Sequence, residues 1–301
     1  MSIFLRIPAT SANLGPGFDR LGLALSLYLE VYAAEAPEWS FELEGEGAES
    51  LARDESNLIA SAYQKGCARW GWPPTPFRLK VRNQVPLNRG LGSSATAIVA
   101  GLCLALLNHQ NQLDRDLLTQ AASEMEGHPD NVAPAIWGGL QLAVQPLPGL
   151  VMQEMPIHPE LKVLVVIPES EAKTEAMRAI LPAQPSADVL AQTETLLQQL
   201  LHGLAHNRLE DLASSSLDVR HQPYRLAVQP MSQKIFDAFR SEPWGAGVFL
   251  SGSGPTLGCW IQDPHTAELA QQRLSQLEVP VRTYLLAPDH QGVYYEKTHR
   301  S

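Results

Sequence analysis

The chain has 301 residues, of which 32 are acidic and 22 are basic, and its formal net charge is -10. This negative excess argues against a protein that binds nucleic acid or an anionic membrane through its surface. Apolar residues make up 45% and charged residues 18%, which is typical of a folded globular chain, and the length corresponds to about two domains of ~150 residues.

The cysteines and the apolar segments favour a soluble protein of a reducing compartment. Cys67, Cys103 and Cys259 lie far apart and form no CxxC pair, so we expect neither a disulfide framework nor a zinc ribbon. The first residues lack the basic and apolar regions of a secretory signal. The longest apolar run, 95–107, is shorter than the ~20 residues of a spanning helix and predicts a buried core helix. We therefore expect a cytoplasmic protein.

The hydrophobic pattern predicts strands and helices in irregular succession. Strands are expected at 27–33, 77–85, 161–167, 247–250, 257–261 and 279–286, and helices at 94–107, 114–126, 187–205 and 264–276. Because the two types do not alternate strictly, we expect an α+β fold and not a doubly wound sheet. Prolines and glycines at 145–150 predict a boundary near residue 155.

The segment PLNRGLGSSATA (86–97) lies between an expected strand and the expected core helix. Its glycines would let the backbone approach an anion closely, and the helix N-terminus adds free N–H groups and the positive end of the helix dipole. The segment therefore predicts a phosphate site. Ser93 and Ser94 would cap the helix and could also reach a divalent cation.

Two other phosphate motifs compete for this segment. A Walker A loop is excluded, because it requires a lysine and none occurs between residues 81 and 161. A dinucleotide fingerprint would use Gly90, Gly92 and Ala95, with Asp114 as the ribose-binding acid. The alternating strand before the loop and the proline at its start disfavour the fingerprint, which stays open as an alternative.

Glu126 is expected in the last turn of the 114–126 helix, where the helix dipole disfavours a negative charge. Most glutamates in such places are simply solvated. A second interpretation is a magnesium site, since Mg²⁺ binds one or two protein oxygens together with substrate phosphates. Ser93 and Glu126 would supply those oxygens.

Six segments together resemble the GHMP kinases. Besides the 86–97 loop, they are IPATSANLGPGFDRLGLAL (7–25), EGHPDNVAPAIWGGLQL (126–142), VVIPESEAKTEAMRAILP (165–182), DVRHQPYR (218–225) and GAGVFLSGSGPTLG (245–258). The loop alone indicates only the family. The other segments resemble more specifically the branch of the family that phosphorylates the side-chain hydroxyl of L-homoserine in threonine biosynthesis.

This resemblance implies a two-domain fold and a homodimer. Residues 1–155 would form an ATP-binding domain of the ribosomal S5 domain 2-like type, and residues 156–301 a ferredoxin-like domain. ATP with Mg²⁺ and L-homoserine would meet between the two domains. Such an enzyme needs no nucleic-acid or membrane partner.

The resemblance also implies roles for individual residues. ATP would be bound by Asn57, Pro86, Leu87, Asn88, Arg89, Gly90, Leu91, Gly92, Ser93, Ser94, Ala95 and Thr96. Mg²⁺ would be held by Ser93 and Glu126. Homoserine would be bound by Asn13, Asp19, His128, Asn131, Thr174, Arg178 and Arg225. The residues closest to the chemistry would be Asn131, Glu126 and Ser93.

The residue types suit a zwitterionic amino acid. Arg178 and Arg225 can each grip a carboxylate through two parallel hydrogen bonds, and Asp19 can bind the ammonium group. Mevalonate kinases carry aspartate at the position of Asn131, and an amide cannot take up a proton. We therefore expect direct transfer to an oriented hydroxyl, with Asp19 as the alternative base.

Two alternatives remain within the family. One is a kinase for another small alcohol such as mevalonate, which has a carboxylate but no ammonium group for Asp19. The other is a non-catalytic nucleotide-binding relative, against which the presence of both Ser93 and Glu126 argues.

Overall fold

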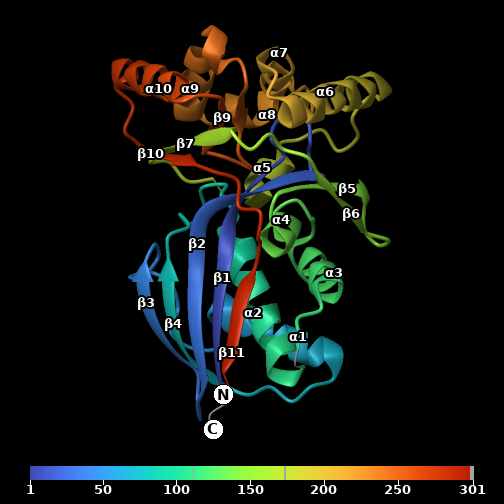
Figure 1. Ribbon diagram of the computed structural model, residues 1–301, viewed down its shortest axis with the longest axis vertical. Helices are drawn as coiled ribbons and strands as arrows, with labels where there is room; N and C mark the ends of the chain where they lie inside the picture. Colours follow the sequence, from blue (N-terminus) through green and yellow to red (C-terminus); the bar gives the residue numbers. More distant parts are fainter. Residues whose placement is uncertain (111, 173, 299–301) are drawn as a thin grey trace.

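Two sheets with helices packed against them make up residues 1–110, 112–172 and 174–298, which the computed structural model describes (Figure 1). The first half of the chain forms β1 (Ser2–Ala12), β2 (Leu21–Glu35), β3 (Ser40–Gly45), α1 (Leu58–Trp70), β4 (Phe77–Asn83), α2 (Ser93–His109), α3 (Arg115–Glu126), α4 (Val132–Trp137), β5 (Leu140–Gln145) and β6 (Val151–Met155).

The second half contributes most of the upper part of Figure 1. Its elements are β7 (Lys162–Pro168), α5 (Thr174–Ala179), α6 (Ala187–His206), α7 (Leu209–Leu212), η1 (Ala213–Leu217), α8 (Gln222–Ala227), α9 (Pro230–Arg240), η2 (Pro243–Gly245), β8 (Val248–Leu250), β9 (Leu257–Ile261), α10 (Pro264–Leu277), β10 (Val281–Leu286) and β11 (Tyr294–Thr298). The mixture of helices and mostly antiparallel strands confirms the α+β class.

The first sheet runs in the order β11-β1-β2-β4-β3, with β5 paired to β2 and β6 to β5. β1 and β2 pair antiparallel from Ser2 opposite Ala34 to Ala12 opposite Gly22, with a change of register after Pro8. The second sheet runs β10-β7-β9-β8. A division into 1–155 and 156–301 stays a prediction, and the chain returns to the first sheet through β11, which pairs with β1.

The helices begin and end where local chemistry places them. Asp114 caps α3 by accepting from the Leu117 N–H, and Gly127, with a φ of 91°, ends it. α2 is almost wholly buried from Ala95 to Leu107, as its apolar composition predicts. The strands and helices expected from the hydrophobic pattern are present with bounds shifted by a few residues. The pattern missed β1, β3, β5, β6 and β11 among the strands, and α1, α4, α5, α7, α8 and α9 among the helices.

The ends of several elements meet between the two sheets. The Thr10 N–H near the end of β1 donates to Leu91 O (3.1 Å), and the Gly252 N–H donates to Ala12 O (2.9 Å). The Ser251 hydroxyl donates to Gly90 O at 2.6 Å. The loop before α2 is therefore held on one side by β1 and on the other by the 251–254 turn of the second half.

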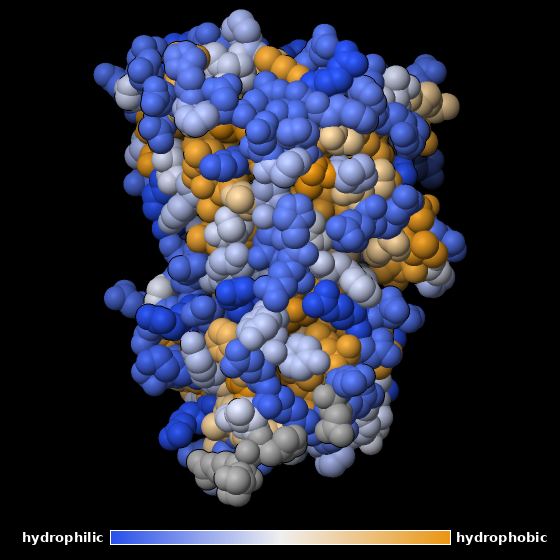
Figure 2. All heavy atoms as spheres, viewed as in Figure 1, coloured by the Kyte–Doolittle hydropathy of each residue, from blue (hydrophilic) through white to orange (hydrophobic). Residues whose placement is uncertain are grey.

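The outer face is mixed in character. Figure 2 shows hydrophilic residues over most of the upper helices and smaller apolar areas between polar ones lower down. In the described part of the chain, no helix has both the length and the apolar character needed to cross a bilayer.

Candidate active site

A cavity of about 360 Å³ lies where β1, the loop before α2 and the 251–254 turn meet. Residues from both halves of the chain line it. The predicted residues that line it are Asn13, Asp19, Asn57, Leu87, Asn88, Arg89, Gly90, Gly92, Ser93, Ser94, Thr96, Glu126, His128, Asn131, Thr174, Arg178 and Arg225. Pro86, Leu91 and Ala95, also predicted, are buried and lie outside this lining.

The loop before α2 has the backbone geometry that its glycines suggested. Gly90 and Gly92 have φ of 78° and 70°, in the left-handed region. A Cβ on Gly90 would lie 2.3 Å from Ser251 O, and one on Gly92 would lie 2.0 Å from the Thr10 hydroxyl oxygen. Side chains are therefore excluded at both positions, and the cavity reaches the backbone and the first turn of α2.

The expectation that Ser93 and Ser94 cap α2 is wrong. The N-cap is Gly92, and no side chain caps the helix. Both serines lie inside the first helical turn, and the Ser94 hydroxyl instead donates to Glu126 Oε2 at 3.1 Å. The first N–H groups of α2 have no intrahelical partners, as in any helix, and they are available to an anion.

Part of the cavity lining is apolar. Leu29, Leu43, Leu51, Leu58, Leu87 and Val81 form this part. Asn57 stands beside this wall as the N-cap of α1, accepting from the Ile59 N–H (3.0 Å) and donating to Ala52 O (2.8 Å). Motif analysis missed the apolar wall apart from Leu87, because leucine and valine at these positions resemble ordinary core residues.

Glu126 ends α3 beside the first turn of α2. Burial raises the pKa of this carboxyl, and the His128 ring and the Ser94 hydroxyl oppose the increase. Two effects disfavour a charged carboxylate here: its partial burial, and the negative end of the helix dipole at the C-terminus of α3. A cation beside it would therefore be stabilising. Among the described residues, no group of three His, Cys, Asp or Glu side chains could hold a metal alone.

His128 and Asp130 form a close pair in the cavity wall. His128 Nδ1 lies 2.5 Å from Asp130 Oδ1, and Asp130 is only 2% exposed. Burial alone would lower the pKa of His128, but the Asp130 carboxylate outweighs that effect and the pKa is raised. The pair fixes the ring with Nδ1 toward Asp130.

Asp19 and Arg178 line the cavity together and form a bidentate ion pair. Arg178 donates to the two Asp19 carboxylate oxygens at 2.6 and 2.9 Å. The guanidinium also lies 5.7 Å from the centre of the Phe18 ring. Asp19 and Arg178, which are predicted to bind opposite charges of one substrate, are thus hydrogen-bonded to each other in this structure.

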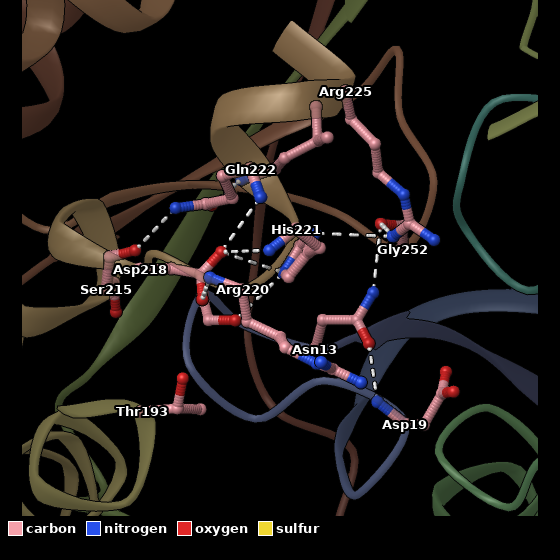
Figure 3. Close-up of polar contacts among 12 residues, drawn as sticks. Asn13, Asp19, Thr193, Ser215, Asp218, Arg220, His221, Gln222, Arg225 and Gly252 are labelled. Atoms are coloured by element: carbon pink, nitrogen blue, oxygen red, sulfur yellow. Dashed lines mark hydrogen bonds and ion pairs between the residues drawn. The ribbon is translucent and has the colours of Figure 1, made fainter. Parts of the chain in front are cut away.

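Arg225, drawn in Figure 3 with His221 and Gly252, is the second cation that lines the cavity. Its side chain is 2% exposed. It donates to Gly252 O (2.9 Å), Met177 O (3.2 Å) and His221 Nδ1 (3.2 Å). Burial and the Arg178 charge lower the pKa of Arg225 to about 10, which leaves it charged at neutral pH.

The chain is similar to known proteins over most of its length. Residues 57–139 match the GHMP kinases N terminal domain, and residues 196–278 match the GHMP kinases C terminal domain. The chain is 42% identical over 253 residues to a homoserine kinase of Carboxydothermus hydrogenoformans, covering 83% of this chain and 82% of the relative. It is 37% identical over 290 residues to one of Moorella thermoacetica, covering 96% and 98%.

A solved structure agrees with these matches. The crystal structure of homoserine kinase from Cytophaga hutchinsonii superposes with a TM-score of 0.82 at 25% identity, covering 98% of this chain and 97% of the other. The chain belongs to the homoserine kinases of the GHMP kinase family. The family fold and the kinase class implied by the resemblance are thereby confirmed, and the loop before α2 is a GHMP kinase loop, not a dinucleotide fingerprint.

Motif comparison did not single out four residues in or behind the wall of this homoserine kinase cavity: Asp130 lines it, and the other three contact residues that line it. The four are Thr10, which contacts Asn131; Phe18, whose ring lies 5.3 to 5.7 Å from three guanidinium carbons; Asp130; and His221. Each lies inside a quoted segment, but nothing in the sequence shows which residue it contacts.

Proposed function

We propose that this chain transfers the γ-phosphoryl group of ATP to the side-chain hydroxyl of L-homoserine, giving O-phospho-L-homoserine. One observation carries the proposal. A single cavity is lined by the loop and first turn of α2, which would bind an anion and form the phosphate end, and by the Asp19–Arg178 pair with Arg225, which would form the acceptor end. Membership of the homoserine kinases agrees with that pairing of a phosphate donor and a zwitterionic acceptor.

The acceptor end matches the charges of an amino acid. Arg225 is buried and positively charged. In the described part of the chain, its hydrogen-bond partners are two backbone carbonyls and a histidine ring, and none is a carboxylate. Together with Arg178 it would bind the carboxylate of homoserine, and Asp19 would bind the ammonium group. The substrate carboxylate would then replace Asp19 as the partner of Arg178, and the substrate ammonium group would replace Arg178 as the partner of Asp19. Each side chain would keep an oppositely charged partner.

The lining of the phosphate end suits a nucleoside triphosphate. The apolar wall formed by the leucines and Val81 would contact the adenine, and the loop backbone with the first turn of α2 would hold the phosphates. This arrangement explains how an acidic protein binds a polyanion without a lysine in the loop. Local backbone dipoles, not the total charge, provide the attraction.

Ser93 and Glu126 would hold Mg²⁺ beside the phosphates. Their oxygens suit a hard cation, both line the cavity, and the cation would offset the cost of the partly buried carboxylate. When bound, the ion would supply positive charge to the phosphate oxygens. The Ser94 hydroxyl keeps the Glu126 carboxylate in place near the first turn of α2.

The transfer step would depend on positioning. Phosphoryl transfer has a loose transition state, so an aligned hydroxyl needs little help from a base. Asn131 lines the cavity and can donate hydrogen bonds but cannot accept the proton. Asp19 is engaged with Arg178, which disfavours it as a base.

A coupled ADP-release assay with homoserine, mevalonate and galactose side by side tests the proposal. We expect turnover with homoserine only and a phosphomonoester product on its side-chain oxygen, identified by ³¹P NMR. Equal or higher turnover with mevalonate would contradict the assignment of the acceptor. Absence of ADP release with all three would contradict the activity itself.

The homodimer and the cytoplasmic location remain predictions that rest on the family resemblance and on the free cysteines. Sedimentation of the purified chain at micromolar concentration tests the first of them. We expect the mass of two copies.

A further inference from the structure

Asn131 occupies the N-cap position of α4, yet its side chain makes no capping hydrogen bond. Its backbone carbonyl accepts from the Ala135 N–H at 3.3 Å, so the backbone alone begins the helix. The side-chain amide instead lies in the cavity wall beside Gly92 and accepts a hydrogen bond from the Thr10 hydroxyl at 2.8 Å. An asparagine that gives up the cap has its side chain free for another role.

Thr10 lies near the end of β1 and is fully buried. Within the described residues it does not belong to the lining of the cavity, whereas Asn131 does. A substrate in the cavity would therefore meet the amide of Asn131 and not the hydroxyl of Thr10. Any influence of this hydroxyl on the reaction would pass through Asn131.

The fold keeps space for this contact. A Cβ on Gly92 would lie 2.0 Å from the Thr10 hydroxyl oxygen and 3.2 Å from Asn131 Oδ1. The Thr10 N–H also donates to Leu91 O at 3.1 Å, which fixes β1 against the loop. The absence of a side chain at Gly92 thus leaves room for the hydrogen bond between Thr10 and Asn131 directly beside the first turn of α2.

We infer that Thr10 is a positioning residue that turns the Asn131 amide so that its nitrogen faces the reacting groups. An amide has an oxygen that only accepts and a nitrogen that only donates. With the oxygen bonded to Thr10 on the buried side, the two N–H donors are left for the open side. Donors that point at phosphoryl oxygens stabilise the charge of the transition state, whereas the reversed amide would present a carbonyl oxygen to that charge.

This inference deepens the proposed function and rests on it, because it assumes transfer of a phosphoryl group past Asn131. It predicts a kinetic effect with a particular signature. Loss of the hydroxyl should lower kcat and leave the KM values for ATP and homoserine within about twofold, since the interaction matters most in the transition state.

The variants Thr10→Val and Thr10→Ser test the hydroxyl. Valine keeps the shape of threonine without the donor, and we expect kcat to fall about tenfold, less than the 10² or more that loss of a whole donor costs. Serine keeps the donor, and we expect it to restore kcat to within about threefold of the unchanged protein. Thr10→Ala, which adds no atom to the tight space beside Gly92, serves if the valine variant does not fold.

Two further variants separate positioning from general stability. Thr119, another buried threonine, donates to Arg115 O (2.7 Å) and accepts from Trp137 Nε1 (2.8 Å) away from the cavity. Thr119→Val should lower the unfolding temperature and leave kcat unchanged. In an Asn131→Ala background, which already lacks the amide, Thr10→Val should lower kcat no further.

The outcomes distinguish the inference from the proposed function. No phosphorylation of homoserine by the unchanged protein would contradict the proposed function. With that activity present, two results would overturn the inference alone: a Thr10→Val variant with unchanged kcat, or the same tenfold loss in the Asn131→Ala background. A loss in Thr10→Val, recovery in Thr10→Ser and no additional loss in the double variant would establish it.

Discussion

The two ends of the cavity are built in different ways. At the proposed phosphate end, one continuous stretch, 86–96, would supply backbone groups, and the conformations of Gly90 and Gly92 shape it. At the acceptor end, single side chains arrive from distant parts of the chain, such as Asp19 and Arg178, which are 159 residues apart. A polyanion of constant shape can be recognised by backbone dipoles, whereas an amino acid with two opposite charges requires specific side chains.

This difference predicts how each end fails. The phosphate end should be sensitive to added atoms, even an uncharged methyl group, because its tolerance is set by backbone distances. The acceptor end should tolerate small changes in shape but not changes in charge. Glu126 is bonded to Ser94 in the first turn of α2 and is close enough to Arg178 to be affected by its charge. Its replacement should both remove a metal ligand and change the pH dependence.

Gly90→Ala should have the largest effect. The new methyl group would stand 2.3 Å from Ser251 O and 3.0 Å from Gly254 O, on a residue with a φ of 78°. Either the loop or the 251–254 turn must move, and we expect kcat/KM for ATP to fall at least a hundredfold, as a displacement of ~1 Å at a reacting site does. Steady-state kinetics with ATP as the varied substrate measures the loss.

Gly71→Ala is the matched control for this variant. Gly71 ends α1 with a φ of 71°, but a Cβ there would meet no atom within 4 Å. It therefore carries the same backbone strain of about 1 kcal/mol without the clash. Stability should fall slightly in both variants, and only Gly90→Ala should lose activity. Equal kinetic losses would show that the loop geometry is not what matters.

Glu126→Gln should lower turnover by about ten- to a hundredfold and raise the Mg²⁺ concentration needed for half-maximal rate, as the loss of a metal contact does. The amide keeps the shape of the side chain and can still accept from the Ser94 hydroxyl. Titration of the rate with Mg²⁺ measures both effects. Unchanged turnover and Mg²⁺ dependence would refute the metal role.

The same variant should change how stability depends on pH. Because burial raises the pKa of Glu126, the folded protein holds this proton to a higher pH than the unfolded chain does. The contribution to stability is present below the unfolded pKa of about 4.3 and is lost as the pH rises through the folded value. Without Mg²⁺, the unfolding temperature of Glu126→Gln relative to the unchanged protein should rise between pH 4 and 8. A constant difference would contradict this expectation.

Asp19→Asn should have a smaller effect, on recognition. Loss of the charge that would bind the ammonium group should raise KM for homoserine at least about tenfold, since a charge-assisted hydrogen bond contributes about 1.5 to 3 kcal/mol. The value of kcat should stay within about threefold. Asp116→Asn, an exposed position in the first turn of α3, changes the net charge equally and should have no effect on KM. A loss confined to kcat would instead support Asp19 as the base.

The left-handed glycines of the loop and the buried helix after it could be predicted from the sequence because these features are local, whereas phosphate binding there stays a prediction. Glycines, serines and a following apolar helix stand next to one another in the chain, and each has a defined conformational effect. The acceptor residues came from the family resemblance, since composition and periodicity treat Arg178 or Asp19 as ordinary surface charges. Their mutual pairing could not be predicted, because it depends on the packing of α5 against the turn after β1.

The hydrogen bond between Thr10 and Asn131 could not be predicted from the sequence either. Thr10 and Asn131 are 121 residues apart, and neither residue type in its local context indicates the other. The serine caps of α2 were wrongly expected because serine usually caps from outside the helix, whereas here Gly92, in a left-handed conformation, ends the loop one residue earlier. Backbone geometry there is decided by contacts with β1 and the 251–254 turn.

Glu171→Gln should have the smallest effect, and it tests whether any side-chain charge matters at the phosphate end. Arg89 in the loop lies 3.8 Å from the Glu171 carboxylate, which is 61% exposed, so solvent screens the pair. If backbone groups hold the phosphates, removing this partner should change KM for ATP by less than about twofold at physiological salt. A change of tenfold or more would mean that the charge of Arg89 is balanced between Glu171 and ATP. The contrast between a backbone-built and a side-chain-built end would then no longer hold.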